Sequence, residues 1–310
     1  MTAPRIKVTS PSFSRNPVLR EELLATFPMT AFNESGGHLA GPALAEFLAG
    51  ADGAVIGLEA IDAALLDACR RLRIVAKYGV GLDNIDADAC RSRGVALGWT
   101  GGVNRRSVAE LTLAFMIGLC RNVFATSRQL HDGVWNKDGG VQLSGLTVGI
   151  IGFGHVGRDV ARLLAPFGCP ILVNDINPDA WHGWGGPPVT PVTKEELYAA
   201  ADVVTLHVPL TPQTLGLIDA TALARLKPGA RLINTARGGL VDEAALKEAL
   251  RNGQLSGAAL DVFAIEPPAD PELLALPTLA GTPHIGGSAR EAVMAMGRSA
   301  IDHLRRHFGS

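Results

Sequence analysis

The sequence is poor in aromatic side chains, in cysteine and in long apolar stretches. Of 310 residues, 10 are Phe, 4 are Trp and 2 are Tyr. The four cysteines, Cys69, Cys90, Cys120 and Cys169, form no Cys-x-x-Cys pair and lack the histidine spacing of a zinc site, so we expect reduced, mostly buried thiols. No stretch of about 18 apolar residues occurs, and the first residues lack the apolar core of a signal peptide. A soluble, cytoplasmic protein is the expectation.

An excess of charge of one sign is also missing. The 28 Lys and Arg residues stand against 30 Asp and Glu residues, which gives a formal net charge of −2. A protein that neutralises many phosphates needs a strongly positive surface. The composition therefore predicts neither a nucleic acid nor a membrane as partner.

Glycine is the residue in surplus, with 36 copies. The glycines follow no three-residue period and 47% of residues are hydrophobic, which excludes collagen-like and disordered chains. At roughly 150 residues per domain, the length suggests about two domains. The surplus is therefore expected in turns and close backbone approaches.

Short runs of Val, Ile and Leu alternate with helical patterns along nearly the whole chain, which is typical of βαβ units around a parallel sheet. The expected strands are Ile6–Thr9, Ala54–Ile56, Arg73–Ala76, Val95–Leu97, Thr147–Ile151, Ile171–Asn174, Val203–Leu206, Arg231–Asn234 and Ala258–Leu260. The class expected is α/β.

Three helices are predicted from capping and periodicity. Asn16 followed by Pro17 predicts a helix start, and the apolar face expected after it is Leu19, Leu23, Leu24 and Phe27. A single long helix is expected over Ser107–Leu130, with a broad apolar surface that suits a link between domains and a symmetric dimer interface. The residues after His284 form one further helix, too short for a domain, that returns to the first domain.

One glycine motif has the context of a dinucleotide site. Gly152-Phe153-Gly154-His155-Val156-Gly157 follows an apolar strand and opens a helical pattern, and the acidic Asp175 stands at the end of the next strand. In such a motif Gly152 permits the turn, Gly154 lets amides approach a pyrophosphate, and Gly157 allows close packing. Asp175 suits a ribose hydroxyl and repels a 2′-phosphate, so the motif predicts NAD rather than NADP.

Three candidate catalytic residues follow strands or strand-like runs. Arg237 follows Arg231–Asn234, Glu266 follows Ala258–Leu260, and His284 lies in a Pro- and Gly-bounded loop. In open parallel sheets functional groups gather at the carboxyl ends of strands. A base, a carboxylate that orients it and a cation that binds an anion form a coherent proton-transfer set.

Together these motifs resemble the D-2-hydroxyacid dehydrogenases, and most closely their phosphoglycerate dehydrogenase-like branch without a regulatory domain. The resemblance covers nearly the whole chain. The residues that carry it, beside the glycine motif, are Gly79-Val80-Gly81-Leu82-Asp83-Asn84-Ile85-Asp86, His207-Val208-Pro209-Leu210-Thr211, Asn234-Thr235-Ala236-Arg237-Gly238, Asp261-Val262-Phe263, Glu266-Pro267 and Thr282-Pro283-His284-Ile285-Gly286-Gly287. It implies an NAD-binding Rossmann-type domain, residues 104–283, inserted into a discontinuous flavodoxin-like substrate domain, residues 1–103 plus 284–310.

The resemblance also implies roles for single residues. His284 would exchange the proton of the C2 hydroxyl while hydride moves between C2 and nicotinamide, Glu266 would support His284, and Arg237 would hold the substrate carboxylate. The remaining substrate residues would be Lys77, Tyr78, Gly79, Val80 and Gly81. The remaining cofactor residues would be His155, Val156, His207, Thr214, Thr235 and Asp261. No metal site is expected. The resemblance implies a homodimer.

The identity of the acid stays open at this point. Lys77, Arg105 and Arg106 are extra cations that suit a second anionic group, as in 3-phosphoglycerate, but solvated charge or a dimer contact explains them equally well. A glyoxylate or hydroxypyruvate reductase is the alternative. Val80 stands where phosphite dehydrogenases have lysine, and Glu266 stands where formate dehydrogenases have Gln. A non-catalytic NAD(H)-sensing protein, like the corepressors of this fold, is the remaining alternative.

Overall fold

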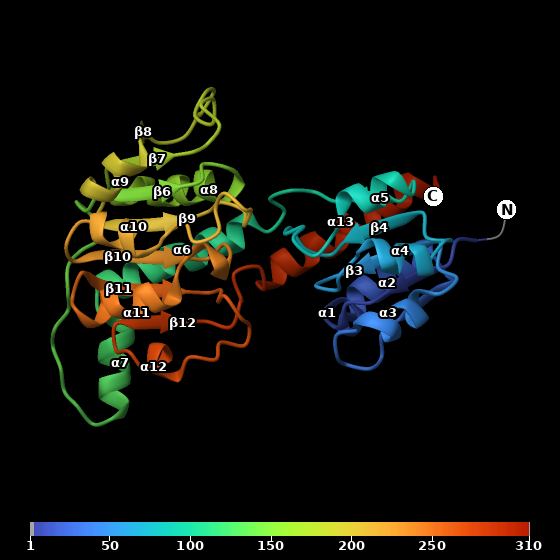
Figure 1. The fold of residues 1–310 in the computed structure, drawn as a ribbon, viewed down its shortest axis with the longest axis horizontal. Coiled ribbons are helices and arrows are strands. Elements are labelled where there is room, and N and C mark those ends of the chain that lie inside the picture. Colours follow the sequence, from blue (N-terminus) through green and yellow to red (C-terminus); the bar gives the residue numbers. More distant parts are fainter. Residues whose placement is uncertain (1–2, 310) are drawn as a thin grey trace. The chain divides into compact units, whose positions relative to one another are not determined.

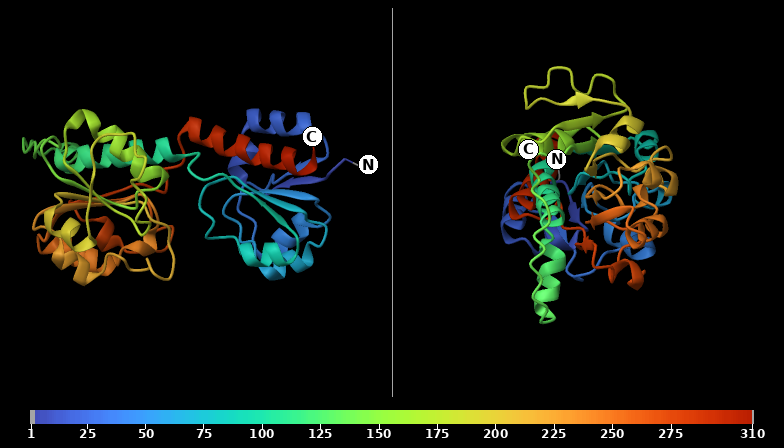
Figure 2. Two further views of the ribbon diagram at one scale, coloured as in Figure 1. Left: turned by 90° about the horizontal axis from the view of Figure 1, so that it is seen from above. Right: turned by 90° about the vertical axis from the view of Figure 1, so that its left-hand side faces the viewer.

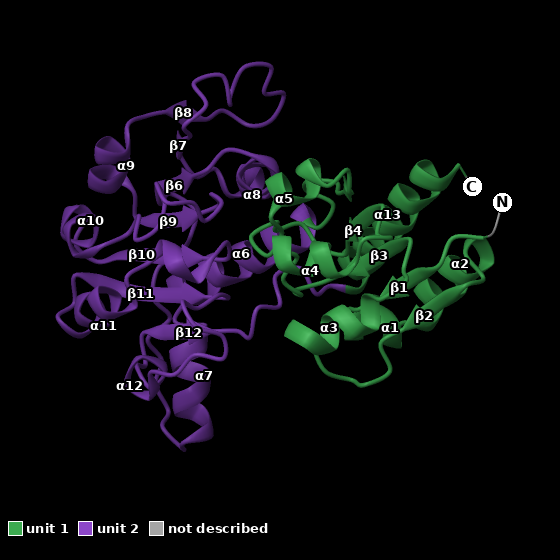
Figure 3. Ribbon diagram, turned by 45° about the vertical axis from the view of Figure 1, so that its right-hand side comes forward, with its two compact units in different colours: residues 1–104, 290–310 green, residues 105–289 purple. Residues whose placement is uncertain are grey.

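The computed structural model describes residues 3–309, which form two compact units (Figure 1). Unit 1 comprises residues 1–104 and 290–310, and unit 2 comprises residues 105–289 (Figure 3). The first boundary lies next to the expected 103/104. The second lies beyond the expected 283/284, so the loop that carries His284 is part of unit 2.

Unit 1 is built on a five-stranded sheet in which every pair of neighbours is parallel. Its strands, in spatial order, are β2 (Thr30–Phe32), β1 (Ile6–Val8), β3 (Gly53–Ile56), β4 (Ile74–Lys77) and β5 (Ala96–Gly98). The order 2-1-3-4-5 is that of flavodoxin-like folds. The expected fold class is thereby confirmed for this unit.

Helices cover both faces of the unit-1 sheet, and each face has its own apolar core. One core contains residues of α1 (Pro11–Arg15), α2 (Pro17–Thr26) and α13 (Arg290–Phe308). The other contains residues of α3 (Gly41–Leu48), α4 (Ala63–Ala68) and α5 (Ala87–Ser92). Helix α13, the last helix of the chain, thus packs in the same core as α1 and α2.

The start of α2 follows the predicted capping pattern. The Asn16 side chain accepts hydrogen bonds from the N–H groups of Val18 and Leu19, both at 3.1 Å. Leu19 and Leu23 are fully buried, as predicted. The prediction for Leu24 is wrong, since this side chain is 38% exposed.

Helix α13 lies along α2 at close range (Figure 2). A Cβ atom on Gly297 would lie 2.4 Å from the side chain of Leu19, well inside contact distance. Glycine at this position therefore lets the two helices approach. On the surface, Arg298 forms an ion pair with Glu22 at 2.7 Å.

Unit 2 contains a seven-stranded sheet whose neighbours are again all parallel. In spatial order its strands are β12 (Leu279–Gly281), β11 (Leu255–Leu260), β10 (Ala230–Asn234), β9 (Val203–Leu206), β6 (Val148–Ile151), β7 (Ile171–Asn174) and β8 (Thr190–Pro191). The chain reverses its direction of winding at β6, which lies between β7 and β9. This is the arrangement of a Rossmann-type domain, whose ligands bind at such a switch point.

Helices also flank this sheet on both sides (Figure 2). On one side are α6 (Arg105–Cys120), α8 (His155–Leu164) and the 3₁₀ turn η1 (Ala165–Phe167). On the other are α9 (Lys194–Ala200), α10 (Ala220–Arg225), η2 (Gly238–Leu240), α11 (Glu243–Arg251) and α12 (Pro271–Leu274). The remaining helix of the unit is α7 (Val123–His131).

The prediction of one helix over Ser107–Leu130 is wrong, because α6 and α7 are separate and meet at 68°. Asn122 between them has a φ of +53°, in the left-handed region. The carbonyl of Cys120 accepts from the N–H of Val141 at 2.8 Å. No single helix in residues 3–309 has the length and apolarity needed to cross a membrane; α6 and α7 pass that test only together, as a bent pair.

The glycine turn between β6 and α8 allows a matched stability test. A Cβ atom on Gly157 would lie 2.1 Å from the carbonyl oxygen of Gly152, whereas one on Gly154 would have no neighbour within 4 Å. We expect Gly157→Ala to destabilise the protein by about 2 kcal/mol or more, through overpacking against backbone. Gly154→Ala is expected to change stability by less than about 0.5 kcal/mol. Thermal melting of both variants measures this, and equal losses would contradict the packing role of Gly157.

Candidate active site

The glycine turn after β6 leaves open space at a helix N-terminus. Gly152 has a φ of +96°, and a Cβ atom there would lie 2.5 Å from the carbonyl oxygen of His207. Gly154 is the N-cap of α8, whose hydrogen bonds begin with Arg158 N–H to Gly154 O at 3.1 Å. The preceding N–H groups have no acceptor within the helix, and the helix dipole favours an anion beside them. The turn therefore fits a pyrophosphate.

Asp175 closes this turn from the neighbouring strand. One oxygen of its carboxylate accepts from the N–H of Phe153 at 2.6 Å, and the other accepts from the N–H of Asn177 at 2.9 Å. The carboxylate is thereby fixed beside the glycine turn, where the ribose of a dinucleotide is expected. The next residue, Ile176, is 98% exposed.

The loop after Asp175 packs back onto the turn, which the sequence did not indicate. The ring of Trp184 meets that of Phe153 edge to face at 5.1 Å, and the Arg162 guanidinium lies 4.6 Å above Trp184. Arg158 also donates to the carbonyl of Ala180. The sequence showed only the Gly and Pro content of this loop. Its contacts depend on residues of the glycine turn and of α8, which lie earlier in the chain.

His207 follows β9, and its side chain is held in the neutral form. Burial lowers the pKa of His207 to about 3, and its Nε2 lies 3.0 Å from the hydroxyl of Thr205. The uncharged ring is therefore the form present at neutral pH. Thr214 lies in the following loop, where its hydroxyl donates to the carbonyl of Pro209 at 2.7 Å.

His284 and Glu266 form a close pair. The Nδ1 atom of His284 lies 2.8 Å from Oε2 of Glu266, and the two side chains are 41% and 39% exposed. The second carboxylate oxygen accepts from the N–H of Phe263 at 3.1 Å, which orients Glu266. Since an ionised carboxylate only accepts, Nδ1 carries hydrogen in this pair. Nε2 is then the nitrogen that can exchange a proton with a substrate.

Asp261, at the end of β11, holds the loop that carries His284. Its buried carboxylate accepts from the hydroxyl of Thr282 at 2.6 Å and from the N–H groups of Ile285 and Gly286, both at 2.7 Å. A Cβ atom on Gly286 would lie 2.8 Å from that carboxylate. The resemblance implies a cofactor contact for Asp261, which stays a prediction; the contacts within unit 2 add a structural role that was not expected.

Arg237 and Thr235 both follow β10. The Arg237 guanidinium donates to the carbonyl of Ala236 at 2.6 Å, and the Arg237 carbonyl accepts from the Asn234 side chain at 2.8 Å. The hydroxyl of Thr235 lies 2.9 Å from that of Thr112 on α6. These residues share the carboxyl edge of the sheet with the His284 pair, as expected from their positions after parallel strands.

In unit 1 the segment Tyr78–Gly81 leaves the end of β4. Tyr78 is buried, its hydroxyl lies 3.2 Å from that of Ser12, and burial raises its pKa. Gly79 has a φ of +147°. The carbonyl of Val80 accepts from the indole N–H of Trp99 at 2.7 Å, a contact that sequence reasoning missed.

Two of the extra cations, Lys77 and Arg106, have partners inside their own units. Lys77 is 4% exposed, and its ammonium donates to Gly57 O at 2.5 Å and to Asn84 Oδ1 at 2.7 Å. Arg106 forms an ion pair with the buried Asp159 of α8 at 3.0 Å. The prediction that these cations read a second anion on the substrate stays a prediction.

Comparison with known proteins agrees with this geometry. Residues 113–286 match the family model described as "D-isomer specific 2-hydroxyacid dehydrogenase, NAD binding domain". A D-3-phosphoglycerate dehydrogenase of Mycobacterium tuberculosis is 40% identical over 249 residues, which are 79% of this chain and 47% of that protein. The chain thus spans about half the length of this relative. A hydroxypyruvate reductase of Thermotoga maritima is 36% identical over 255 residues, 80% of this chain and 82% of that protein.

Solved structures share the whole fold. The TT0316 protein of Thermus thermophilus is 36% identical with a TM-score of 0.84, over 98% of this chain and 97% of that one. A glyoxylate/hydroxypyruvate reductase of Sinorhizobium meliloti, solved with NADP and malonate, is 31% identical with a TM-score of 0.84, over 100% of this chain and 95% of that one. The family model and these relatives show that the chain belongs to the D-isomer specific 2-hydroxyacid dehydrogenases and contains their NAD-binding domain.

Proposed function

We propose that this chain is an NAD-dependent dehydrogenase that interconverts a 2-oxo acid and the corresponding D-2-hydroxy acid. The observation that carries the proposal is the His284–Glu266 pair at 2.8 Å, in the same unit and at the same sheet edge as the glycine turn. A proton carrier beside a dinucleotide site is what transfer of a hydride and a proton requires.

In this proposal His284 holds the proton of the reaction at Nε2. During reduction it gives that proton to the oxygen on C2 of the oxo acid, and during oxidation it takes the proton back. When bound, NADH supplies the hydride that C2 receives. Glu266 keeps Nδ1 hydrogen-bonded throughout, which fixes the ring orientation and stabilises the imidazolium.

Substrate binding is assigned to Arg237 and to the loop of unit 1. The planar guanidinium of Arg237 suits the C1 carboxylate and polarises the C2 oxygen. The N–H groups of Val80 and Gly81 provide further donors for the carboxylate. Unit 1 is accordingly proposed as the substrate domain and unit 2 as the cofactor domain.

The proposed cofactor residues surround the glycine turn. Gly152, Gly154, His155, Val156 and Gly157 would hold the pyrophosphate, and Asp175 the adenosine ribose. His207, Thr214, Thr235 and Asp261 complete the set. The support for these roles is the open space beside Gly154 and the fixed carboxylate of Asp175.

The substrate proposed is a small 2-oxo acid, such as 3-phosphohydroxypyruvate, hydroxypyruvate or glyoxylate. Relatives named for phosphoglycerate and for hydroxypyruvate both match this chain. The cytoplasm is the proposed location, since all four cysteines are buried free thiols that suit a reducing compartment.

Replacing His284 by Gln tests the proton carrier. With NADH, we expect the wild type to reduce at least one of glyoxylate, hydroxypyruvate and 3-phosphohydroxypyruvate. His284→Gln is expected to lower kcat about 10³-fold, because general acid–base catalysis is worth roughly 10²–10⁴. The NADH dissociation constant should change less than about twofold.

A second histidine serves as control. His182 is paired with Asp179, also at 2.8 Å, on an exposed surface of unit 2. His182→Gln is expected to leave kcat unchanged. If His284→Gln keeps full turnover, His284 is not the proton carrier; if the wild type binds NADH but reduces no 2-oxo acid, the proposed function is wrong and an NAD(H)-sensing protein becomes the better description.

Substitutions of Asp175 test the cofactor preference. Removing the carboxylate removes its repulsion of a 2′-phosphate, so we expect Asp175→Ala to raise the kcat/KM ratio of NADPH to NADH at least tenfold. Asp175→Asn keeps an acceptor for the N–H of Phe153 but loses the charge, and should shift the ratio in the same direction. An unchanged ratio in both variants would rule out the ribose assignment.

A homodimer is the proposed assembly, formed over the segment that contains α7 and the chain after it. This segment exposes Val123, Leu130, Val134, Trp135 and Val141, of which Trp135 is 76% exposed. Sedimentation velocity is expected to show a dimer, and Trp135→Asp to weaken dimerisation at least tenfold. Met29→Asp, at an exposed apolar residue of unit 1, is the control and should remain dimeric. A monomeric wild type would contradict the proposal.

A further inference from the structure

A buried lysine lies at the base of the unit-1 loop that follows β4. Lys77 is the last residue of this strand and is only 4% exposed, although its side chain carries a charge. The stem lies close to the loop, since a Cβ atom on Gly79 would be 3.0 Å from Cε of Lys77. Burying an ammonium is unfavourable unless it forms strong hydrogen bonds. Its acceptors therefore reveal what the lysine does.

Those acceptors join the two ends of the loop to a neighbouring strand end. The ammonium donates to the carbonyl of Gly57, just after β3, at 2.5 Å. It also donates to Oδ1 of Asn84, beyond the loop, at 2.7 Å. Segment 78–83 is thus closed at its base by a side-chain bond between the residue before it and the residue after it.

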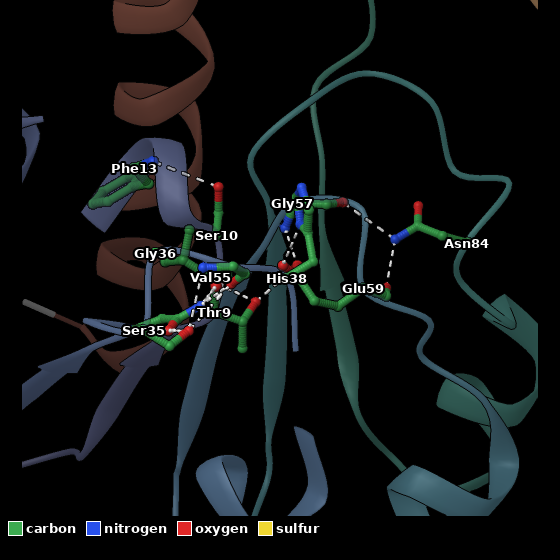
Figure 4. A network of polar contacts seen from close by, with 12 residues as sticks. Thr9, Ser10, Phe13, Ser35, Gly36, His38, Val55, Gly57, Glu59 and Asn84 are labelled. Carbon is green, nitrogen blue, oxygen red and sulfur yellow. Dashed lines mark hydrogen bonds and ion pairs between the residues drawn. The ribbon is translucent and has the colours of Figure 1, made fainter. Parts of the chain in front are cut away.

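Asn84 strengthens the same connection. Its amide donates to the carbonyl of Glu59 at 2.6 Å and to that of Gly57 at 3.2 Å, as Figure 4 shows. The main-chain carbonyl of Asn84 accepts from the N–H of Ile61 at 2.8 Å. The far end of the loop is therefore fixed to residues 57–61 by both side chain and backbone.

Residues 57–59 are themselves held firmly. The buried carboxylate of Glu59 accepts from the N–H of Gly57 at 2.6 Å and from the hydroxyl of Thr9 at 2.8 Å (Figure 4). Thr9 N–H in turn donates to Val55 O at 2.9 Å. Hydrogen bonds consequently connect the ends of β1, β3 and β4, and they support segment 78–83.

We propose that Lys77 and Asn84 are positioning residues, which hold loop 79–81 in the conformation that presents the N–H groups of Val80 and Gly81 to the substrate carboxylate. The proposal rests on the proposed function of that loop. It assigns the Lys77 charge to holding the two ends of the loop at Gly57 and Asn84, and not to a second anion on the substrate. The Trp99 indole, bonded to Val80 O at 2.7 Å, provides a third point of attachment.

Lys77→Met tests this assignment, because it keeps the stem and removes the ammonium. Asn84 Oδ1 then loses this donor, and Gly57 O keeps the 3.2 Å bond from the Asn84 amide. Every 2-oxo acid has the C1 carboxylate, so a displaced loop should weaken the binding of each of these acids by the same factor. We expect KM to rise at least tenfold, by the same factor for glyoxylate and for 3-phosphohydroxypyruvate, with kcat and the NADH dissociation constant within threefold of the wild type. A KM increase confined to the phosphorylated acid would show direct contact and overturn the proposal.

Lys7→Met is the matched control for loss of stability. Lys7 lies on β1 of the same sheet, and its ammonium donates to the carbonyl of Ala49 at 2.9 Å, away from the loop. This variant should leave the KM of both acids within twofold of the wild type. If it raises KM as much as Lys77→Met does, the effect is general destabilisation and the proposal is wrong.

Two further measurements separate the proposal from the proposed function. Hydrogen exchange of the amides in residues 78–83 requires no turnover, and we expect it to become at least tenfold faster in Lys77→Met and unchanged in Lys7→Met. Unchanged exchange in Lys77→Met would overturn the positioning role even in an inactive protein. In a double-mutant cycle, Lys77→Met and Asn84→Ala should raise KM together by clearly less than the product of their single effects. Independent, multiplicative effects would show that the two residues do not act through one bond.

Discussion

The parallel direction of every strand is the constraint on which the rest of this structure depends. In a parallel sheet all carboxyl ends meet at one edge, so each segment that follows a strand reaches the same edge. In unit 2 the glycine turn follows β6, Asp175 follows β7 and His207 follows β9. Arg237, Asp261 and His284 follow β10, β11 and β12. The parallel sheet thereby brings residues more than a hundred positions apart in sequence to the same edge.

Gathering side chains at one edge does not by itself orient them, and the His284 loop shows what does. His284 has a φ of +54°, a left-handed conformation that costs a residue with a side chain of the order of 1–3 kcal/mol. Its N–H donates to the carbonyl of Asp261 at 2.8 Å, and the Asp261 carboxylate accepts three further hydrogen bonds from the same loop. Charge-assisted bonds to a buried carboxylate are strong enough to offset that strain. These hydrogen bonds therefore fix the backbone at His284 in the conformation in which the imidazole contacts Glu266.

Sequence patterns located the strands with strong apolar runs and missed those without them. Strand β6 was expected almost at its observed bounds, because Val148–Ile151 is fully buried on both faces. Strands β2, β8 and β12 were not predicted, since Thr-Ala-Phe, Thr-Pro and Leu-Ala-Gly are too short to form an apolar run. Likewise, the break between α6 and α7 depends on a hydrogen bond from Val141, which lies far along the chain and leaves no periodic signal. The site residues were found by their places after strands, but the partners of Asp261, Lys77 and Trp99 were not, because sequence gives the position of a charge and not the direction of its side chain.

In each unit a buried charge holds a loop that follows a strand, and the two charges have opposite sign. The polar groups around each charge determine which sign is needed. The loop after β12 turns N–H groups toward the core, so an anion, Asp261, satisfies them. At the end of β4 the groups to be satisfied are the carbonyl of Gly57 and the side-chain oxygen of Asn84, so a cation, Lys77, is placed there. A carboxylate at the second position would leave those oxygens facing another acceptor, and an ammonium at the first would leave N–H groups facing another donor. The sign of each buried charge therefore follows from whether donors or acceptors surround it at the strand end: N–H groups and a hydroxyl around Asp261, and two oxygens around Lys77.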